Sequence, residues 1–319
     1  MNIKNVGVIG AGTMGSSIAY LMALNGMNVT LVDVSDDMLK KGQTSIRKIM
    51  DSQIRFYETR VEKEVNRIEK LGITLTENQK KAMETKLNVE FNKLEFEKIA
   101  NNVKTTMDYG DLSGVDLIIE AAFENFDVKS SILKRLSGTV KENTIVASNS
   151  SSISVTKMAS HYKFPEKFIL THFFNPPYTL PLVEIVRGLR TDSETFDTVM
   201  NFFKSIHNHR GSMKPIHVKE IPGFLVNRIL VPMINEAFMI LDENVASPED
   251  IDIAMKTGAG MPMGPLELAD MVGIDVTYDV IRILFEEYGD PKYRPSVLLK
   301  KYKDSGKLGR KTGSGVFTY

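Results

Sequence analysis

The residues best suited to acid–base chemistry in this sequence are His172 and Glu184. His172 ends an apolar run that begins at Phe168, and Glu184 lies inside the apolar run 182–186. A histidine titrates near neutral pH and can therefore take a proton from a hydroxyl group. A carboxylate in an apolar segment is costly to bury without a partner. Spacing alone leaves two interpretations: Glu184 orients His172, or it belongs to an unrelated buried salt bridge.

A second polar group, Ser148–Ser152, also follows an apolar, strand-like run. Ligands of open α/β sheets bind at the carboxyl ends of the strands. Its hydroxyls could therefore bond to a substrate hydroxyl or to a ribose, although an ordinary polar turn would have the same composition. His207 and His209 lie in a polar segment, and we expect no catalytic role for them.

A glycine-rich segment near the start of the chain predicts a ligand more specifically. It matches the pattern G-x-G-x-x-G and comprises Gly10, Ala11, Gly12, Thr13, Met14 and Gly15. It follows a strand-like run and opens a helix-like run. In that setting the first glycine permits a tight turn, the second lets a pyrophosphate approach the backbone, and the third packs helix on strand. The free N–H groups of the helix also attract phosphate.

Asp33 strengthens this interpretation. It closes the next strand-like run, about 20 residues after the motif begins, where a carboxylate binds the adenosine ribose hydroxyls. A carboxylate at this place repels a 2′-phosphate, so Asp33 favours NAD over NADP. The motif and Asp33 together predict an NAD site.

Strand-like and helix-like segments alternate from residue 6 onward, which favours a parallel sheet. The expected strands are residues 6–9, 28–32, 116–120, 144–148, 168–172 and 182–186, with a helix over 16–24. We expect the last strand at a sheet edge, and residues 207–214 as a loop. From residue 221 the pattern turns helical. The predicted fold is an α/β Rossmann-like domain in residues 1–220, followed by an all-α domain in residues 221–319.

Residues 36–100 differ from their surroundings because they are dense in charges of both signs. Apolar residues recur there at helical spacing, Ser35 is a suitable N-cap, and Gly72 interrupts the pattern. A capping box over Thr76–Gln79 starts a second stripe that continues through Phe91 and Leu94. We expect a long helical hairpin inserted in the first domain, with the charges on its solvated face.

The composition limits the other function classes. The 319 residues contain 40 basic and 40 acidic side chains and no cysteine. Zero net charge gives no reason to expect nucleic acid or membrane partners, and the lack of cysteine removes thiolate metal sites and thiol nucleophiles. We expect no metal. Neither an export signal nor a membrane-spanning run is visible, so a cytoplasmic location is expected.

Taken together, these motifs resemble the short-chain L-3-hydroxyacyl-CoA dehydrogenases. The resemblance extends over nearly the whole chain and keeps its order. It rests on GAGTMG, IEAAFEN, SNSSS, HFFNPP, LVEIV, PGFLVNR, GAGMPMGPLELAD and KLGRKTGSGVF. It implies reversible, NAD-dependent oxidation of a (3S)-3-hydroxyacyl-CoA such as 3-hydroxybutyryl-CoA, in a homodimer formed through the helical domain.

The resemblance also implies roles for individual residues. His172 is the general base, Glu184 orients it, and Ser151 and Asn227 contact the reacting end of the substrate. Besides the glycine motif and Asp33, the implied cofactor contacts are Glu124, Lys129, Asn149, Ser151, Asn175 and Lys311.

The chain departs from the family pattern in three places. The helical hairpin is longer than usual, and it holds the family's CoA contacts, for which Ser45 and Lys48 are the candidates here. The segment around His209 is also longer. The sequence Asn175–Tyr178 resembles a related branch that oxidises free hydroxy acids such as L-gulonate, which is the alternative function, whereas residues 261–270 resemble the acyl-CoA branch.

Overall fold

The computed structural model describes residues 3–87, 99 and 101–319. The chain divides into two compact units. One contains Met1–Ser150 and Val155–His217, and the other contains Ser151–Ser154 and Val218–Tyr319. The first unit is a Rossmann-like α/β domain and the second is helical, so the predicted fold class is confirmed.

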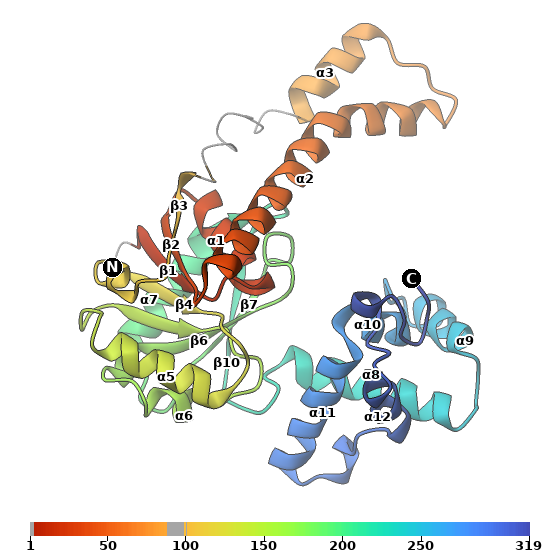
Figure 1. Cartoon of the computed structure of the whole chain (residues 1–319). Helices are drawn as coiled ribbons and strands as arrows, with labels where there is room; N and C mark the ends of the chain where they lie inside the picture. Colours follow the sequence, from red (N-terminus) through yellow and green to blue (C-terminus); the bar gives the residue numbers. More distant parts are fainter. Residues whose placement is uncertain (1–2, 88–98, 100) are drawn as a thin grey trace. The chain divides into compact units, whose positions relative to one another are not determined.

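The first unit is built on an eight-stranded sheet with the order β10-β7-β6-β5-β4-β1-β2-β3 (Figure 1). Its strands are β1 (Asn5–Ile9), β2 (Asn28–Val32), β3 (Val103–Thr106), β4 (Leu117–Glu120), β5 (Ile145–Ser148), β6 (Phe168–Phe173), β7 (Leu182–Val186) and β10 (Lys214–Val218). The paired strands from β1 to β6 run parallel, and β7 is antiparallel to β6. The strand order reverses between β1 and β4, which is where such sheets bind dinucleotides.

Two expectations about this sheet were wrong. β7 is not an edge strand, because β10 lies beyond it. The segment 207–214 is not a simple loop, because β8 (His207–Asn208) and β9 (Gly211–Ser212) form a small antiparallel hairpin. β10 has mostly half-exposed or exposed side chains, as suits an outer strand, so its sequence lacks the apolar run that marks a buried strand.

Helices cover both faces of the sheet. α1 (Thr13–Leu24) and α7 (Ser193–Ser205) share one large apolar core with the strands, to which Leu117 and Ile119 contribute. Ile118 is equally buried and points to the opposite face, as the period of a strand requires. α5 (Phe126–Ser137) and α6 (Val155–Ala159) lie next to each other, and α6 contacts β6 (Figure 1).

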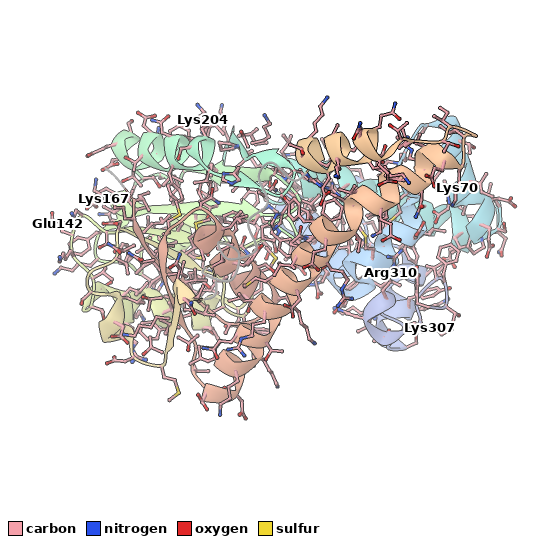
Figure 2. The ribbon with its side chains drawn as sticks, turned by 90° about the horizontal axis from the view of Figure 1, so that it is seen from above. Lys70, Glu142, Lys167, Lys204, Lys307 and Arg310 are labelled. Atoms are coloured by element: carbon pink, nitrogen blue, oxygen red, sulfur yellow. The ribbon has the colours of Figure 1, made fainter. Side chains whose placement is uncertain are left out.

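The charged segment forms the expected hairpin as far as the structure describes it. α2 (Asp36–Glu69) begins at Ser35, whose side chain accepts from the N–H of Met38, and α3 (Glu77–Leu87) returns beside it (Figure 1). The capping box forms, with the N–H of Thr76 donating to Gln79 at 2.8 Å. Lys70 marks the far end of α2 in Figure 2. The expected continuation through Phe91 and Leu94 lies outside the described residues.

The second unit packs five α-helices around its own apolar core. They are α8 (Val226–Asp242), α9 (Pro248–Ile253), α10 (Pro265–Val272), α11 (Ile274–Tyr288) and α12 (Val297–Asp304). A buried carboxylate fixes each end of α10. Asp252 accepts from the N–H groups of Leu266 and Glu267, and Asp270 accepts from those of Val316 and Phe317 in the C-terminal tail.

Short helical turns complete the two units. They are η1 (Tyr109–Leu112), η2 (Pro165–Lys167), η3 (Ala254–Gly258), η4 (Pro291–Tyr293) and η5 (Arg310–Thr312). No helix in the described part of the chain is long and apolar enough to cross a membrane. Residues 3–87, 99 and 101–319 also contain no group of three side chains placed to hold a metal ion.

Candidate active site

The glycine motif forms a tight turn from β1 into α1. Gly10 has a φ of +99°, which favours glycine, and a Cβ there would lie 2.7 Å from the carbonyl oxygen of Ala121. A Cβ on Gly15 would lie only 1.7 Å from the carbonyl oxygen of Gly10. A Cβ on Gly12 would meet nothing within 4 Å, so the loop is open there. Gly10 and Gly15 are therefore required by the fold, whereas Gly12 leaves room for a ligand.

Asp33 lies beside this open loop, just after β2. Its Oδ2 accepts from the N–H of Ala11 at 2.6 Å, and its Oδ1 accepts from the N–H of Val34 at 2.7 Å. Each carboxylate oxygen has a further lone pair, which can accept from a ribose hydroxyl. Thr13 and Met14 begin α1, whose N-terminus has no side-chain cap. Free N–H groups and a fixed carboxylate fit the phosphates and the ribose of NAD.

A buried ion pair lies at the end of β4, the strand next to β1 in the sheet. The ammonium group of Lys129 lies 2.8 and 2.9 Å from the two carboxylate oxygens of Glu120, and both side chains are 1% exposed. Glu120 also accepts from Ser148 at 2.6 Å and from the N–H of Ala122 at 2.7 Å. Sequence reasoning missed Glu120, although it closes an apolar run as a carboxylate, the same signal that marked Glu184.

Glu124 is fixed by the same network. One carboxylate oxygen lies 3.4 Å from Lys129, and the other accepts from the hydroxyl of Ser150 at 2.6 Å. Asn149 accepts from the N–H of Phe173 at 2.9 Å and so ties the end of β5 to β6. The carboxyl ends of three adjacent strands are thus cross-linked by hydrogen bonds.

His172 and Glu184 meet directly. They are opposite each other in the antiparallel β6–β7 ladder, and Nδ1 of His172 lies 2.7 Å from Oε2 of Glu184. The side chain of Glu184 is fully buried, and that of His172 is 8% exposed. If the ring donates its Nδ1 hydrogen to the carboxylate, the neutral form has its lone pair on Nε2. This arrangement suits a base that is held in one orientation.

The comparisons with known proteins identify the family. Residues 5–91 and 53–221 match the family model for the NAD-binding domain of 3-hydroxyacyl-CoA dehydrogenase, and residues 223–319 match the model for its C-terminal domain. The chain belongs to the 3-hydroxyacyl-CoA dehydrogenase family. NAD is therefore the cofactor of the first unit, in agreement with the glycine loop and Asp33.

Individual relatives agree with this assignment. A 3-hydroxybutyryl-CoA dehydrogenase of Bradyrhizobium diazoefficiens is 42% identical over 318 residues, which cover 99% of this chain and 96% of that one. The human mitochondrial hydroxyacyl-coenzyme A dehydrogenase is 36% identical, over 99% of this chain and 91% of the human one. The crystal structure of the (S)-3-hydroxybutyryl-CoA dehydrogenase of Ralstonia eutropha covers 100% of this chain and 99% of its own, with 42% identity and a TM-score of 0.82.

Three of the remaining predicted site residues belong to the first unit of this dehydrogenase. Asn175 is exposed and precedes a cis peptide bond to Pro176. Ser45 and Lys48 are exposed on α2, where the hydroxyl of Ser45 donates to the carbonyl of Lys41.

Three further candidates belong to the second unit. Ser151 lies in its short segment Ser151–Ser154, and Asn227 lies in the first turn of α8. The ammonium group of Lys311 lies 2.5 and 2.6 Å from the carboxylate oxygens of Asp275.

Proposed function

We propose that this protein catalyses the reversible, NAD-dependent oxidation of (3S)-3-hydroxyacyl-CoA to 3-oxoacyl-CoA, with 3-hydroxybutyryl-CoA as the favoured substrate. The main observation behind the proposal is the buried His172–Glu184 pair at the end of β6, in a chain that also has the glycine motif of a dinucleotide site. Relatives named 3-hydroxybutyryl-CoA dehydrogenase, at 42% and 40% identity over nearly the full length, support the substrate.

In this proposal His172 takes the proton of the 3-hydroxyl group at Nε2. The ring then carries a positive charge, which the carboxylate of Glu184 stabilises at 2.7 Å from Nδ1. NAD⁺, held at the glycine motif and Asp33, would supply the acceptor for the hydride that leaves C3 of the substrate. In the reverse direction the protonated ring returns its proton to the oxygen of the 3-oxo group. A positioned base of this kind contributes about 10²–10⁴-fold to the rate.

The other contacts of the reaction are also proposals. Ser151 and Asn227 would contact the reacting end of the substrate, because a hydroxyl and an amide can bond to its oxygen atoms. Glu124 and Asn149 would border the cofactor, as would Asn175, Ser151 and Lys311. Lys129 would act there through Glu120 and Glu124, since its ammonium group is buried against both carboxylates.

The recognition of CoA would involve α2, where Ser45 and Lys48 are exposed on its first half. Lys48 could pair with a phosphate of CoA, although α2 offers other basic residues for the same purpose.

We also propose a homodimer formed through the helical unit. Large apolar side chains are exposed there, among them Ile229 of α8, Met271 and Val272 of α10, and Val276 and Phe285 of α11. Such side chains are typical of surfaces that become buried on association. A cytoplasmic location and a part in fatty acid metabolism belong to the same proposal, which the bacterial relatives support.

The test is an assay of NADH oxidation with acetoacetyl-CoA, beside an assay of NAD⁺ reduction with L-gulonate. We expect turnover in the first assay only. The Asn175–Tyr178 sequence makes a free hydroxy acid the alternative, so turnover of L-gulonate without turnover of acetoacetyl-CoA would refute the proposal. The variant His172→Gln should lower kcat by about 10² or more and leave NADH affinity nearly intact. Full activity of this variant would refute the role of His172.

A further inference from the structure

Three aromatic side chains that are distant in the sequence meet in the first unit: Tyr20 of α1, Tyr178 between β6 and β7, and His209 between β8 and β9. The hydroxyl of Tyr20 lies 2.9 Å from Nε2 of His209. The ring of Tyr178 meets the ring of Tyr20 edge-on, with 5.9 Å between the centroids, and lies 6.4 Å from the ring of His209. We call these three residues the tyrosine–histidine cluster.

The polar contact in this cluster is between neutral groups. Burial, and to a lesser extent the charge of His207, lower the pKa of His209 to about 4. Burial raises the pKa of the Tyr20 hydroxyl, and Tyr20 is fully buried. At neutral pH both groups are therefore uncharged, and the tautomer of the imidazole decides which of the two donates. Removing either partner would leave the other without this hydrogen bond in a site where Tyr20 is buried and His209 is half-buried, which is more costly than the same loss at an exposed site.

Hydrogen bonds attach the cluster to residues 174–181, the connection between β6 and β7. The N–H of His209 donates to the carbonyl of Tyr178 at 3.0 Å. The side-chain amide of Asn208 donates to the carbonyl of Pro177 at 3.1 Å and is buried. The β8–β9 hairpin thus holds two successive carbonyl groups of this connection.

The same hairpin is attached to α1 and to the start of β10. Asn25, which follows α1, donates to the carbonyl of His207 at 2.8 Å and accepts from its N–H at 2.9 Å. Lys214 donates its N–H to the carbonyl of Pro181 at 2.7 Å. The hairpin and the start of β10 together therefore link α1 to both halves of the β6–β7 connection.

This connection joins the strand of His172 to the strand of Glu184. We propose that Tyr20 and His209 are positioning residues, which hold the β6–β7 connection in place so that the acyl-CoA is bound productively beside His172. The proposal rests on the proposed function. It concerns the substrate and not the cofactor, because the connection that the cluster holds joins the strands of His172 and Glu184, whereas Asp33 binds the N–H groups of Ala11 and Val34.

The first test is the variant Tyr20→Phe, which keeps the ring and removes the hydroxyl. We expect kcat/KM for acetoacetyl-CoA to fall about 5- to 10-fold, while the Kd of NADH, measured by fluorescence, changes less than about twofold. The matched control is Tyr162→Phe, because the buried hydroxyl of Tyr162 has no hydrogen-bond partner among the described residues. This control should keep the wild-type kcat/KM.

The second test asks whether the hydrogen bond itself matters. The amide oxygen of Gln can still accept from Tyr20, so His209→Gln should keep more of the wild-type kcat/KM than His209→Leu. The double variant Tyr20→Phe/His209→Leu should lose no more than the worse single variant, because both remove the same interaction.

The outcomes test the positioning role of Tyr20 and His209 separately from the proposed dehydrogenase function. Wild-type kcat/KM in Tyr20→Phe, or equal losses in kcat/KM and NADH affinity, would overturn the positioning role and leave the proposed function intact. A wild-type protein that does not turn over acetoacetyl-CoA would overturn the proposed function, and the positioning role with it. Additive losses in the double variant would show that Tyr20 and His209 act separately, which also contradicts the proposal.

Discussion

Replacing Glu184 by Gln should slow the reaction strongly without disturbing the fold. The side chain of Gln has nearly the same volume, and its amide oxygen can still accept from Nδ1 of His172, so the ring keeps its orientation. What is lost is the negative charge next to the protonated ring. With about 4 Å between the charges and an effective dielectric constant of about 20, their attraction is about 4 kcal/mol. A transition state with half of the proton's charge would lose about 2 kcal/mol and one with the full charge about 4 kcal/mol, so we expect kcat to fall about 30- to 1,000-fold.

The assay follows NADH oxidation at saturating acetoacetyl-CoA, and the Kd of NADH is measured on the same preparation. The matched control is Glu142→Gln, which removes an exposed carboxylate of the same unit (Figure 2) and should leave kcat unchanged. The reasoning would be refuted if Glu184→Gln kept kcat within about threefold of the wild type with NADH binding intact. Loss of NADH binding in this variant would instead indicate that the charge is needed for the fold.

Asp33→Ala should weaken NAD binding and reduce the discrimination against NADP, and an unchanged ratio of the two Kd values would contradict this. Gly12→Ala should leave Tm unchanged, because its Cβ would meet nothing within 4 Å, and should weaken NADH binding. Gly15→Ala should lower Tm, because its Cβ would lie 1.7 Å from a carbonyl oxygen, so equal Tm values for the two variants would count against the loop assignment. The pKa of His209 is lowered from 6.5 to about 4 in the folded state, so the unfolded chain takes up the proton first as the pH falls. Between pH 7 and pH 5 the free energy of unfolding should therefore fall by about 2 kcal/mol more in the wild type than in His209→Gln. Urea titrations of both proteins at the two pH values measure this, and an equal fall in the free energy of unfolding would exclude the effect.

The sequence predicted the sheet well where its strands are buried on both faces. The segments 117–119 and 168–170 are entirely apolar, because helices cover both sides of these strands. β10 was missed because Lys214 and His217 are exposed on it. The prediction that β7 is an edge strand was wrong for the same reason, because β10 lies beyond it. These errors share one cause, since an outer strand gains stability from backbone pairing that leaves little trace in side-chain types.

The sequence predicted which residues form the candidate site better than it predicted which of them contact one another. A carboxylate in an apolar run indicated a partner for Glu184, but the register that places it opposite His172 is a property of the ladder. Glu120 is likewise a carboxylate that closes an apolar run, but no neighbouring strand contains its partner, because Lys129 comes from the following helix. Lys129 was expected at the cofactor, whereas its ammonium group is directed at Glu120. The roles of Ser151 and Asn227 stay predictions.

The two halves of the candidate site differ in how much chain must be ordered before they can form. His172 and Glu184 are 12 residues apart and are joined by one short connection. The crevice between β1 and β4 forms only when Ile9 pairs with Glu120, and the whole α2–α3 hairpin lies between these residues. Closing the longer loop costs more entropy and slows the pairing. During refolding the base and its carboxylate can come together early, and competence to bind NAD is gained late, at a rate that depends on the length of the inserted hairpin.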